Sequence, residues 1–154
     1  MKYKRTKELD FWQLARHYLH NYMPVTRNLS DKSVEAYKQS LKTYLQYLED
    51  EKLLVNEQVG FDAFTRDNIK GFIAWMKNRN CASKTINLKL TAIRSFLKFC
   101  SEEDFELRGI YTEVRSIKKL KEEKHPIVYL QPSATSAILS AYDTNTFKHR
   151  RNRI

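Results

Sequence analysis

Apolar residues recur every three to four positions along most of the chain, the spacing at which one face of an α-helix turns toward a core. This pattern predicts five helical segments before a break, at about residues 10–23, 31–53, from 65 onward, 83–100, and a shorter one at 105–117 that is interrupted or entered near Gly109. Pro24 should end the first segment, because proline disfavours helical geometry in the residue before it. The expected N-caps of the next three are Ser30 or Asp31, Thr65, and Ser83. With only three glycines and three prolines, these runs predict an all-α fold.

The helix expected at 83–100 carries two neighbouring stripes of different chemistry. Its apolar stripe consists of Ile86, Leu90, Ile93, Leu97 and Cys100, and the adjoining polar stripe consists of Lys84, Asn87, Thr91, Arg94 and Lys98. A stripe that mixes cations with Asn and Thr and holds no carboxylate suits phosphates and base edges. Most charged helical faces are only solvated. Evidence from the rest of the chain is therefore needed to choose between a nucleic-acid-binding face and a solvated one.

The net charge of +10 favours a polyanionic partner, and its distribution along the chain indicates which segments would attract that partner. Residues 1–7, 115–124 and 148–153 hold thirteen of the 28 cations but only two of the 18 carboxylates, which leaves the remaining chain close to neutral. The folded middle would therefore have to segregate its charges to bind a nucleic acid.

Short connections between the second, third and fourth segments favour antiparallel neighbours. In that order one end of the bundle would gather five cations, Arg27, Lys32, Lys77, Arg79 and Lys84. The opposite end would gather Glu49, Asp50, Glu51, Asp67, Glu102, Glu103 and Asp104. We expect such an acidic end to point away from a polyanion.

Other chemistry finds little support in the sequence. Cys81 and Cys100 flank one helix instead of forming a metal-ligand spacing, which predicts a reduced, cytoplasmic chain. The four histidines lack cysteine or carboxylate partners at metal-ligand spacing, and no glycine loop could cradle a phosphate, so no metal or cofactor is expected. No apolar run approaches membrane-spanning length, and the amino terminus lacks the apolar core of a signal peptide.

Three sequence blocks, taken in their order and spacing, resemble the core-binding domain of tyrosine recombinases and phage integrases. They are LSDKSVEAY at 29–37 followed by Leu41, FTRDNI at 64–69, and SKTI at 83–86 running into AIRSFLKF at 92–99. The resemblance covers roughly residues 9–117. Beyond a basic linker, the YLQP sequence at 129–132, the helix-like stretch 133–142 and the arginines near the end resemble the opening of the same family's catalytic domain.

The resemblance implies a SAM-like orthogonal bundle of four to five helices with a basic linker and a short helical C-terminal remnant. The expected organisation is a flexible basic arm at 1–8, the DNA-binding domain at 9–117, the linker at 118–130 and the start of a truncated catalytic domain at 131–154. Such a bundle forms half of a C-shaped clamp on duplex DNA, with its second and fourth helices approaching the major groove.

By motif position, the resemblance and the polar stripe together place DNA contacts on ten residues of the bundle: Ser30, Lys32, Ser33, Lys38, Lys84, Thr85, Asn87, Thr91, Arg94 and Lys98. Asn87 could pair with adenine and Thr91 could touch a thymine methyl, although phosphate contacts are the commoner kind. The linker and tail would add backbone contacts from Lys118, Lys119, Lys121, Arg150 and Arg151.

In the resembled family the catalytic residues and the tyrosine nucleophile lie downstream of the position of Ile154, so none of the nine tyrosines is assigned a catalytic role. The leading hypothesis is a DNA-binding module of a mobile element's site-specific recombinase, acting in DNA integration and recombination. It would be a monomer alone and tetrameric on DNA at full length, and would not transfer strands by itself. The alternative is a stand-alone helical regulatory or protein-interaction module whose basic tail attracts nucleic acid nonspecifically.

Overall fold

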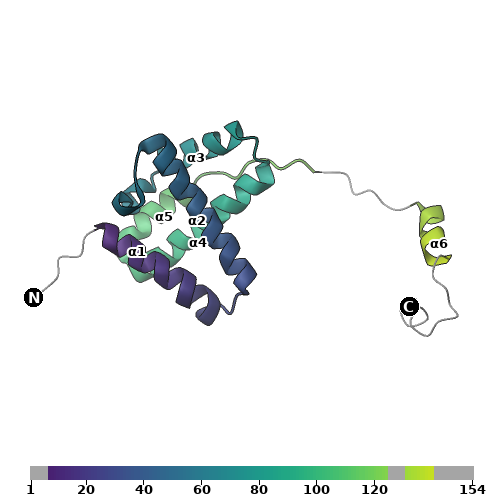
Figure 1. Ribbon diagram of the computed structural model, residues 1–154, viewed down its shortest axis with the longest axis horizontal. Coiled ribbons are helices and arrows are strands. Elements are labelled where there is room, and N and C mark those ends of the chain that lie inside the picture. The colour runs from purple at the N-terminus through teal and green to yellow at the C-terminus, as the bar shows by residue number, and fades with distance from the viewer. Residues whose placement is uncertain (1–6, 125–130, 141–154) are drawn as a thin grey trace, which may run out of the picture. The chain divides into compact units, whose positions relative to one another are not determined.

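The computed structural model describes residues 7–124 and 131–140, and within these ranges all regular structure is helical (Figure 1). The all-α expectation is confirmed. Contacts between residues divide the chain into two units, Met1–Glu122 and Glu123–Ile154. The second unit contributes one described helix, α6 (Pro132–Ser140), which overlaps the helix-like stretch expected at 133–142. All other elements belong to the first unit.

The first helix is longer than expected. It comprises α1 (Lys7–His17) and a π-helical continuation, η1 (Tyr18–Thr26), so Lys7 and Glu8 lie in a helix instead of a flexible arm. The prediction that Pro24 ends the segment is wrong, because the chain has changed to π spacing before it reaches the proline. Hydrogen bonds then span five residues, so the missing proline N–H and its ring do not interrupt a ladder of α-type bonds. The Arg27 N–H closes the segment on the Tyr22 carbonyl at 2.9 Å.

The caps of the second and third helices agree with the sequence pattern. In α2 (Asp31–Lys52) the Ser30 side chain accepts a hydrogen bond from the Ser33 N–H at 3.3 Å. In α3 (Arg66–Asn78) the Thr65 side chain accepts one from the Asn68 N–H at 3.1 Å. Each oxygen satisfies a donor that the first helical turn would leave unpaired.

The fourth helix begins differently. In α4 (Ser83–Glu103) the extended residue before the helix is Ala82, which has no side-chain oxygen, so Ser83 is the first helical residue and not the cap. A 3₁₀ turn, η4 (Phe105–Leu107), then leads into α5 (Arg108–Arg115), which explains the break expected near Gly109.

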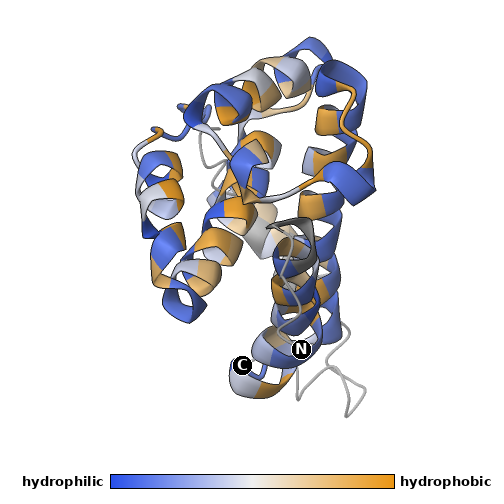
Figure 2. Ribbon diagram, turned by 90° about the vertical axis from the view of Figure 1, so that its left-hand side faces the viewer, coloured by the Kyte–Doolittle hydropathy of each residue, from blue (hydrophilic) through white to orange (hydrophobic). Residues whose placement is uncertain are grey.

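The core forms around α4, which packs against α2, α5 and η4. All five residues of its apolar stripe are buried, and Phe96 and Phe99 widen that face. Phe96 meets Phe11 of α1 edge to face, with ring centroids 5.8 Å apart. In Figure 2 the orange, hydrophobic sides of the helices turn toward one another across this core. Burying an aromatic or branched side chain contributes about 1.5–3 kcal/mol, so α4 anchors the unit.

The relative direction of α2 and α3 differs from the expected up-down order. Two 3₁₀ turns, η2 (Asn56–Gln58) and η3 (Phe61–Ala63), bring the chain back to the middle of α2, where the Tyr44 hydroxyl donates to the Ala63 carbonyl at 2.7 Å. From that point α3 follows the second half of α2. Arg79 at its end pairs with Asp50 at 3.0 Å. The two residues were assigned to opposite ends of the bundle, so that charge-polarity prediction is wrong for them.

Gly71 marks the closest approach of α3 to α2. A Cβ atom there would lie 2.3 Å from the hydroxyl oxygen of Tyr47, whose side chain is 2% exposed. We expect Gly71→Ala to lower the free energy of unfolding by about 1–3 kcal/mol, because overpacking outweighs the gain in helix propensity. Adding Tyr47→Phe removes the clashing oxygen and should recover most of that loss in urea denaturation. A double variant no more stable than Gly71→Ala would show that the clash is not the cause.

Alkaline pH should unfold the protein partly through Tyr44. Burial raises the pKa of its hydroxyl well above the ordinary value, as it does for Tyr18. An unfolded tyrosine ionises near pH 10 while the folded one stays protonated, so the stabilisation is complete below about pH 10 and is lost above it.

Urea denaturation at pH 7 and at pH 11 tests this account with Tyr44→Phe. At pH 7 the variant should lose about 0.5–1.5 kcal/mol with its hydrogen bond. Its stability should then decline less between the two pH values, because phenylalanine cannot ionise. Equal declines in the two proteins would contradict the assignment to Tyr44.

Candidate nucleic-acid interface

The two ends of the polar stripe on α4 are accessible. Lys84 and Lys98 are exposed, and so is Thr85. The two lysines are fourteen residues apart, close to four helical turns, so they project from one side of α4 about 21 Å from each other.

The middle of the stripe turns inward. Asn87 is 4% exposed, and its side-chain amide donates to the Leu120 carbonyl at 2.9 Å and to the Glu122 carboxylate at 2.9 Å. Its side-chain oxygen accepts from the Leu120 N–H at 2.8 Å. Half-buried Thr91 donates its hydroxyl proton to the Asn87 carbonyl at 2.9 Å. In this structure Asn87 therefore faces residues 117–122, the segment that follows α5, which we call the connector. Its amide is not presented to a base edge.

Arg94 also serves the bundle in this structure. Its guanidinium is half-buried and donates to the Ile117 carbonyl, just beyond the C-terminal end of α5. A cation at this position offsets the partial negative charge of a helix end. Burial lowers the pKa of Arg94, and its buried Nε has no hydrogen-bond partner within the described part of the chain. The continuous cationic stripe inferred from spacing is thus interrupted at Asn87 and Arg94.

The second helix supplies the remaining predicted residues. Lys32 is exposed in its first turn, next to the capping pair Ser30 and Ser33, whose hydroxyl groups lie 3.1 Å apart. Lys38 is half-buried and lies 3.8 Å from the Glu35 carboxylate. These residues add hydroxyl groups and two cations to the accessible surface of α2.

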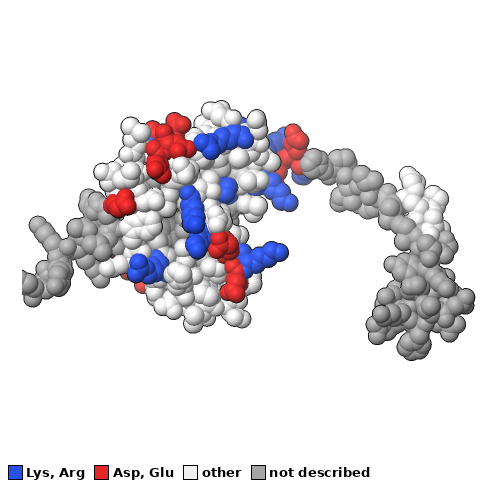
Figure 3. Space-filling view, in the orientation of Figure 1, with Lys and Arg blue, Asp and Glu red and all other residues white. Residues whose placement is uncertain are grey.

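Two further lysines, absent from the predicted site, lie where α2 meets α4. Lys89 donates to the Thr43 hydroxyl at 3.0 Å, and Lys42 next to Thr43 is exposed. Figure 3 shows blue cationic side chains on the face where α2 is seen, with red acidic side chains both beside them and toward the rim of that face. Lys89 falls outside both helical stripes, and only the packing of α4 on α2 reveals its place.

The connector extends this set of cations. Lys118, Lys119 and Lys121 are exposed, and the intervening Leu120 packs against the core. Arg150 and Arg151, the predicted tail contacts, lie outside the described residues.

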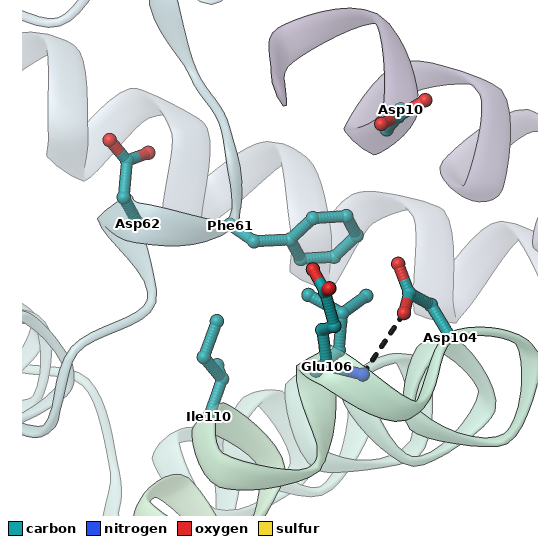
Figure 4. Close-up of a pocket in the computed structure, with 7 residues that line it drawn as sticks. Asp10, Phe61, Asp62, Asp104, Glu106 and Ile110 are labelled. Atoms are coloured by element: carbon teal, nitrogen blue, oxygen red, sulfur yellow. Dashed lines mark hydrogen bonds between the residues drawn. The ribbon is translucent and has the colours of Figure 1, made fainter. Parts of the chain in front are cut away.

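Acidic side chains gather elsewhere, around a cavity of about 240 Å³ (Figure 4). Its walls combine three apolar side chains with four carboxylates, contributed by Asp10, Phe61, Asp62, Asp104, Glu106, Leu107 and Ile110. The Asp104 carboxylate accepts from the Glu106 N–H at 3.0 Å, which fixes the turn into η4. Four carboxylates repel phosphate, so this face is unsuited to DNA.

Other sites are not evident in the described residues. They contain no group of His, Cys, Asp or Glu that could hold a metal ion, and no helix long and apolar enough to cross a membrane. Both cysteines are free, and burial raises the pKa of the Cys100 thiol well above its usual range. Tyr44 and Tyr47 are buried in the core, and the Tyr18 hydroxyl donates to Ser95 at 2.9 Å.

Comparison with known proteins matches residues 17–104 to the model of the phage integrase N-terminal SAM-like domain. The chain is 28% identical over 99 residues to tyrosine recombinase XerD of Oceanobacillus iheyensis, covering 64% of this chain and 32% of the relative. It is 25% identical over 131 residues to tyrosine recombinase XerC of Anoxybacillus flavithermus, covering 85% of this chain and 41% of the relative.

The chain thus spans between a third and two fifths of the length of these relatives. No solved structure matches it significantly. The family model covers more than half of the chain, including α2, α3 and α4 with their buried faces. By this match the chain belongs to the phage integrase family, through its N-terminal SAM-like domain.

Proposed function

We propose that the chain is a DNA-binding module of a site-specific tyrosine recombinase and grips duplex DNA with α2, α4 and the start of the connector. The observation that carries the proposal is the set of lysines on α4, whose residues 83–101 include no carboxylate, and on residues 118–121. Exposed lysines also lie on α2, where carboxylates are interspersed with them, while four carboxylates surround the cavity between α1, η3 and η4. A polyanion is attracted to the first surface and repelled by the second.

Most contacts on this surface would go to phosphates. Lys84 and Lys98 offer mobile ammonium groups along α4, and Lys32 stands at the start of α2 beside two serine hydroxyls. Helix N-termini favour phosphate because their N–H groups are unpaired and the dipole is positive there. Thr85 is the remaining exposed polar side chain in the first turn of α4 and the best-placed residue for a base contact.

We expect strand transfer to be an activity of complete tyrosine recombinases, of which this chain matches only a part. We infer that this chain supplies DNA binding; of its described tyrosines, Tyr44 and Tyr47 are buried and the hydroxyl of Tyr18 is engaged with Ser95, so these three are unsuited to act as a nucleophile. A complete protein of this kind would cut and rejoin DNA during integration and recombination of a mobile element, as a tetramer on DNA. The chain alone is expected to be a monomer.

Fluorescence anisotropy with a 30-base-pair duplex, measured across a salt series, tests the proposal. The double variant Lys84→Glu/Lys98→Glu should bind at least about tenfold more weakly at low salt. It should also show a slope of log affinity against log salt that is smaller by about 1–2, because each lost phosphate contact removes about 0.9 from the slope. Both side chains are exposed, so the fold should be unaffected.

The matched control is Lys52→Glu/Lys70→Glu, which makes the same change of charge at two exposed positions, one on α3 and one at the last residue of α2, about 30 Å along that helix from Lys32. This control should change affinity less than threefold, an effect of net charge alone. A variant lacking residues 144–154 should retain the difference between the two pairs. If both pairs weaken binding equally, or if removal of the tail abolishes it, binding is nonspecific and the alternative of a protein-interaction module takes the lead.

A further inference from the structure

We propose that Asn87 and Arg94 are positioning residues that latch the connector, residues 117–122, onto α4 and thereby make its lysines part of the surface formed by that helix. The latch consists of the Asn87 pairing with Leu120 and Glu122, the Arg94 contact with Ile117, and the packing of Leu120 against the core. Its role in DNA binding rests on the proposed function, but the latch itself is a property of the free protein.

The order of contacts shows that the connector runs along α4 in the opposite chain direction. Ile117 contacts Arg94 and the later Leu120 contacts the earlier Asn87, so the connector approaches the N-terminal end of α4, where Lys84 lies. An extended path fits this order, because three extended residues cover about 10 Å and seven residues of α-helix rise about 10.5 Å.

The Asn87 side chain holds the connector as a neighbouring strand would. Its amide presents one acceptor and one donor, and these meet the N–H and the carbonyl of the same residue, Leu120, at 2.8 and 2.9 Å. A buried amide of this kind loses its partners all at once if the connector lifts, which leaves polar groups unsatisfied. The contact with Leu120 therefore favours the docked conformation of the connector over the undocked one.

The alternation of an extended chain sends the lysines outward. Leu120 faces the core, so its neighbours Lys119 and Lys121 point to the opposite side, in agreement with their exposure. The boundary between the two units of the chain falls after Glu122, five residues beyond the end expected from sequence. The latch accounts for this difference, because it makes residues 118–122 part of the first unit.

Hydrogen exchange of the complete chain without DNA tests the latch directly. In the unmodified protein the Leu120 amide should exchange slowly, and in Asn87→Ala it should exchange at least about tenfold faster while Leu90 and Ile93 keep their protection. Trypsin cleavage after Lys119 and Lys121 should accelerate in parallel. Asn68→Ala is the matched control, because it removes another amide-to-carbonyl hydrogen bond, the 2.9 Å contact with Ala63, without touching the connector.

If Asn87→Ala does not fold, Glu122→Ala provides the second variant. It removes one of the three hydrogen bonds from an exposed residue and should accelerate trypsin cleavage by a smaller factor. A Leu120 amide that is unprotected in the unmodified protein, or cleavage that is unchanged in both variants, would overturn the latch whatever the protein binds.

DNA affinity then tests the positioning role. Asn87→Ala and the triple variant Lys118→Gln/Lys119→Gln/Lys121→Gln should each weaken binding several-fold. Their combination should cost clearly less than the product of the two factors, since lysines that are no longer held contribute less. Independent, multiplicative losses would overturn positioning even with the latch confirmed. Absence of DNA binding in every form would instead refute the proposed function and leave the exchange result standing.

Discussion

The arrangement of the first unit depends on the burial of α4 along most of its circumference. Ile86, Leu90, Ile93 and Leu97 fill one side, and Phe96 and Phe99 carry the core round to α1. The gross burial of these six side chains contributes about as much free energy as the whole net stability of a typical domain, so α4 cannot be displaced without unfolding the unit. A partner can therefore contact α4 only on the narrow strip of its surface that the core does not cover. The polar residues on that strip also make contacts that stabilise the fold.

The direction of α3 determines where the charged side chains lie around α4. Because Tyr44 draws the Ala63 carbonyl to the middle of α2, the end of α3 meets the end of α2, and Arg79 partly neutralises Asp50. Glu49 and Glu51 stay exposed beside Asp50, and other carboxylates gather near the entrance to α5, around Asp104. The charges therefore do not divide between the two ends of the bundle. The carboxylates around the cavity repel a polyanion and the lysines of α4 attract it, an effect that weakens as salt rises.

Helix positions, caps and core residues were predictable because each depends on residues close together in the chain. The 3.6-residue spacing locates Ile86 to Cys100 in the core, and Ser30 and Thr65 cap helices through bonds to residues three positions away. Two local predictions were wrong, the cap at Ser83 and the helix end at Pro24, and neither affects the proposed surface. The failures that change the candidate site involve distant partners. Asn87 shares the spacing of the exposed Lys84, yet its partner Leu120 lies 33 residues further on. Nothing in the neighbourhood of Asn87 reveals that an extended segment will cover it.

The connector sequence nevertheless contains the explanation for its docking. Holding one residue in place costs about 1–2 kcal/mol of backbone entropy, and a hydrogen bond returns only about 0.5–1.5 kcal/mol net, so the polar contacts of Asn87 could not hold five residues by themselves. Between Lys118 and Lys124 the single apolar residue is Leu120, and it is the one that reaches the core. Burial of Ile117 and partial burial of Leu120 add hydrophobic stabilisation to these contacts, and the amide of Asn87 adds direction by pairing with the backbone of Leu120. Docking thus depends on Leu120 in the charged connector and on the amide of Asn87 in α4. Neither the connector sequence nor the α4 sequence predicts this contact without the other.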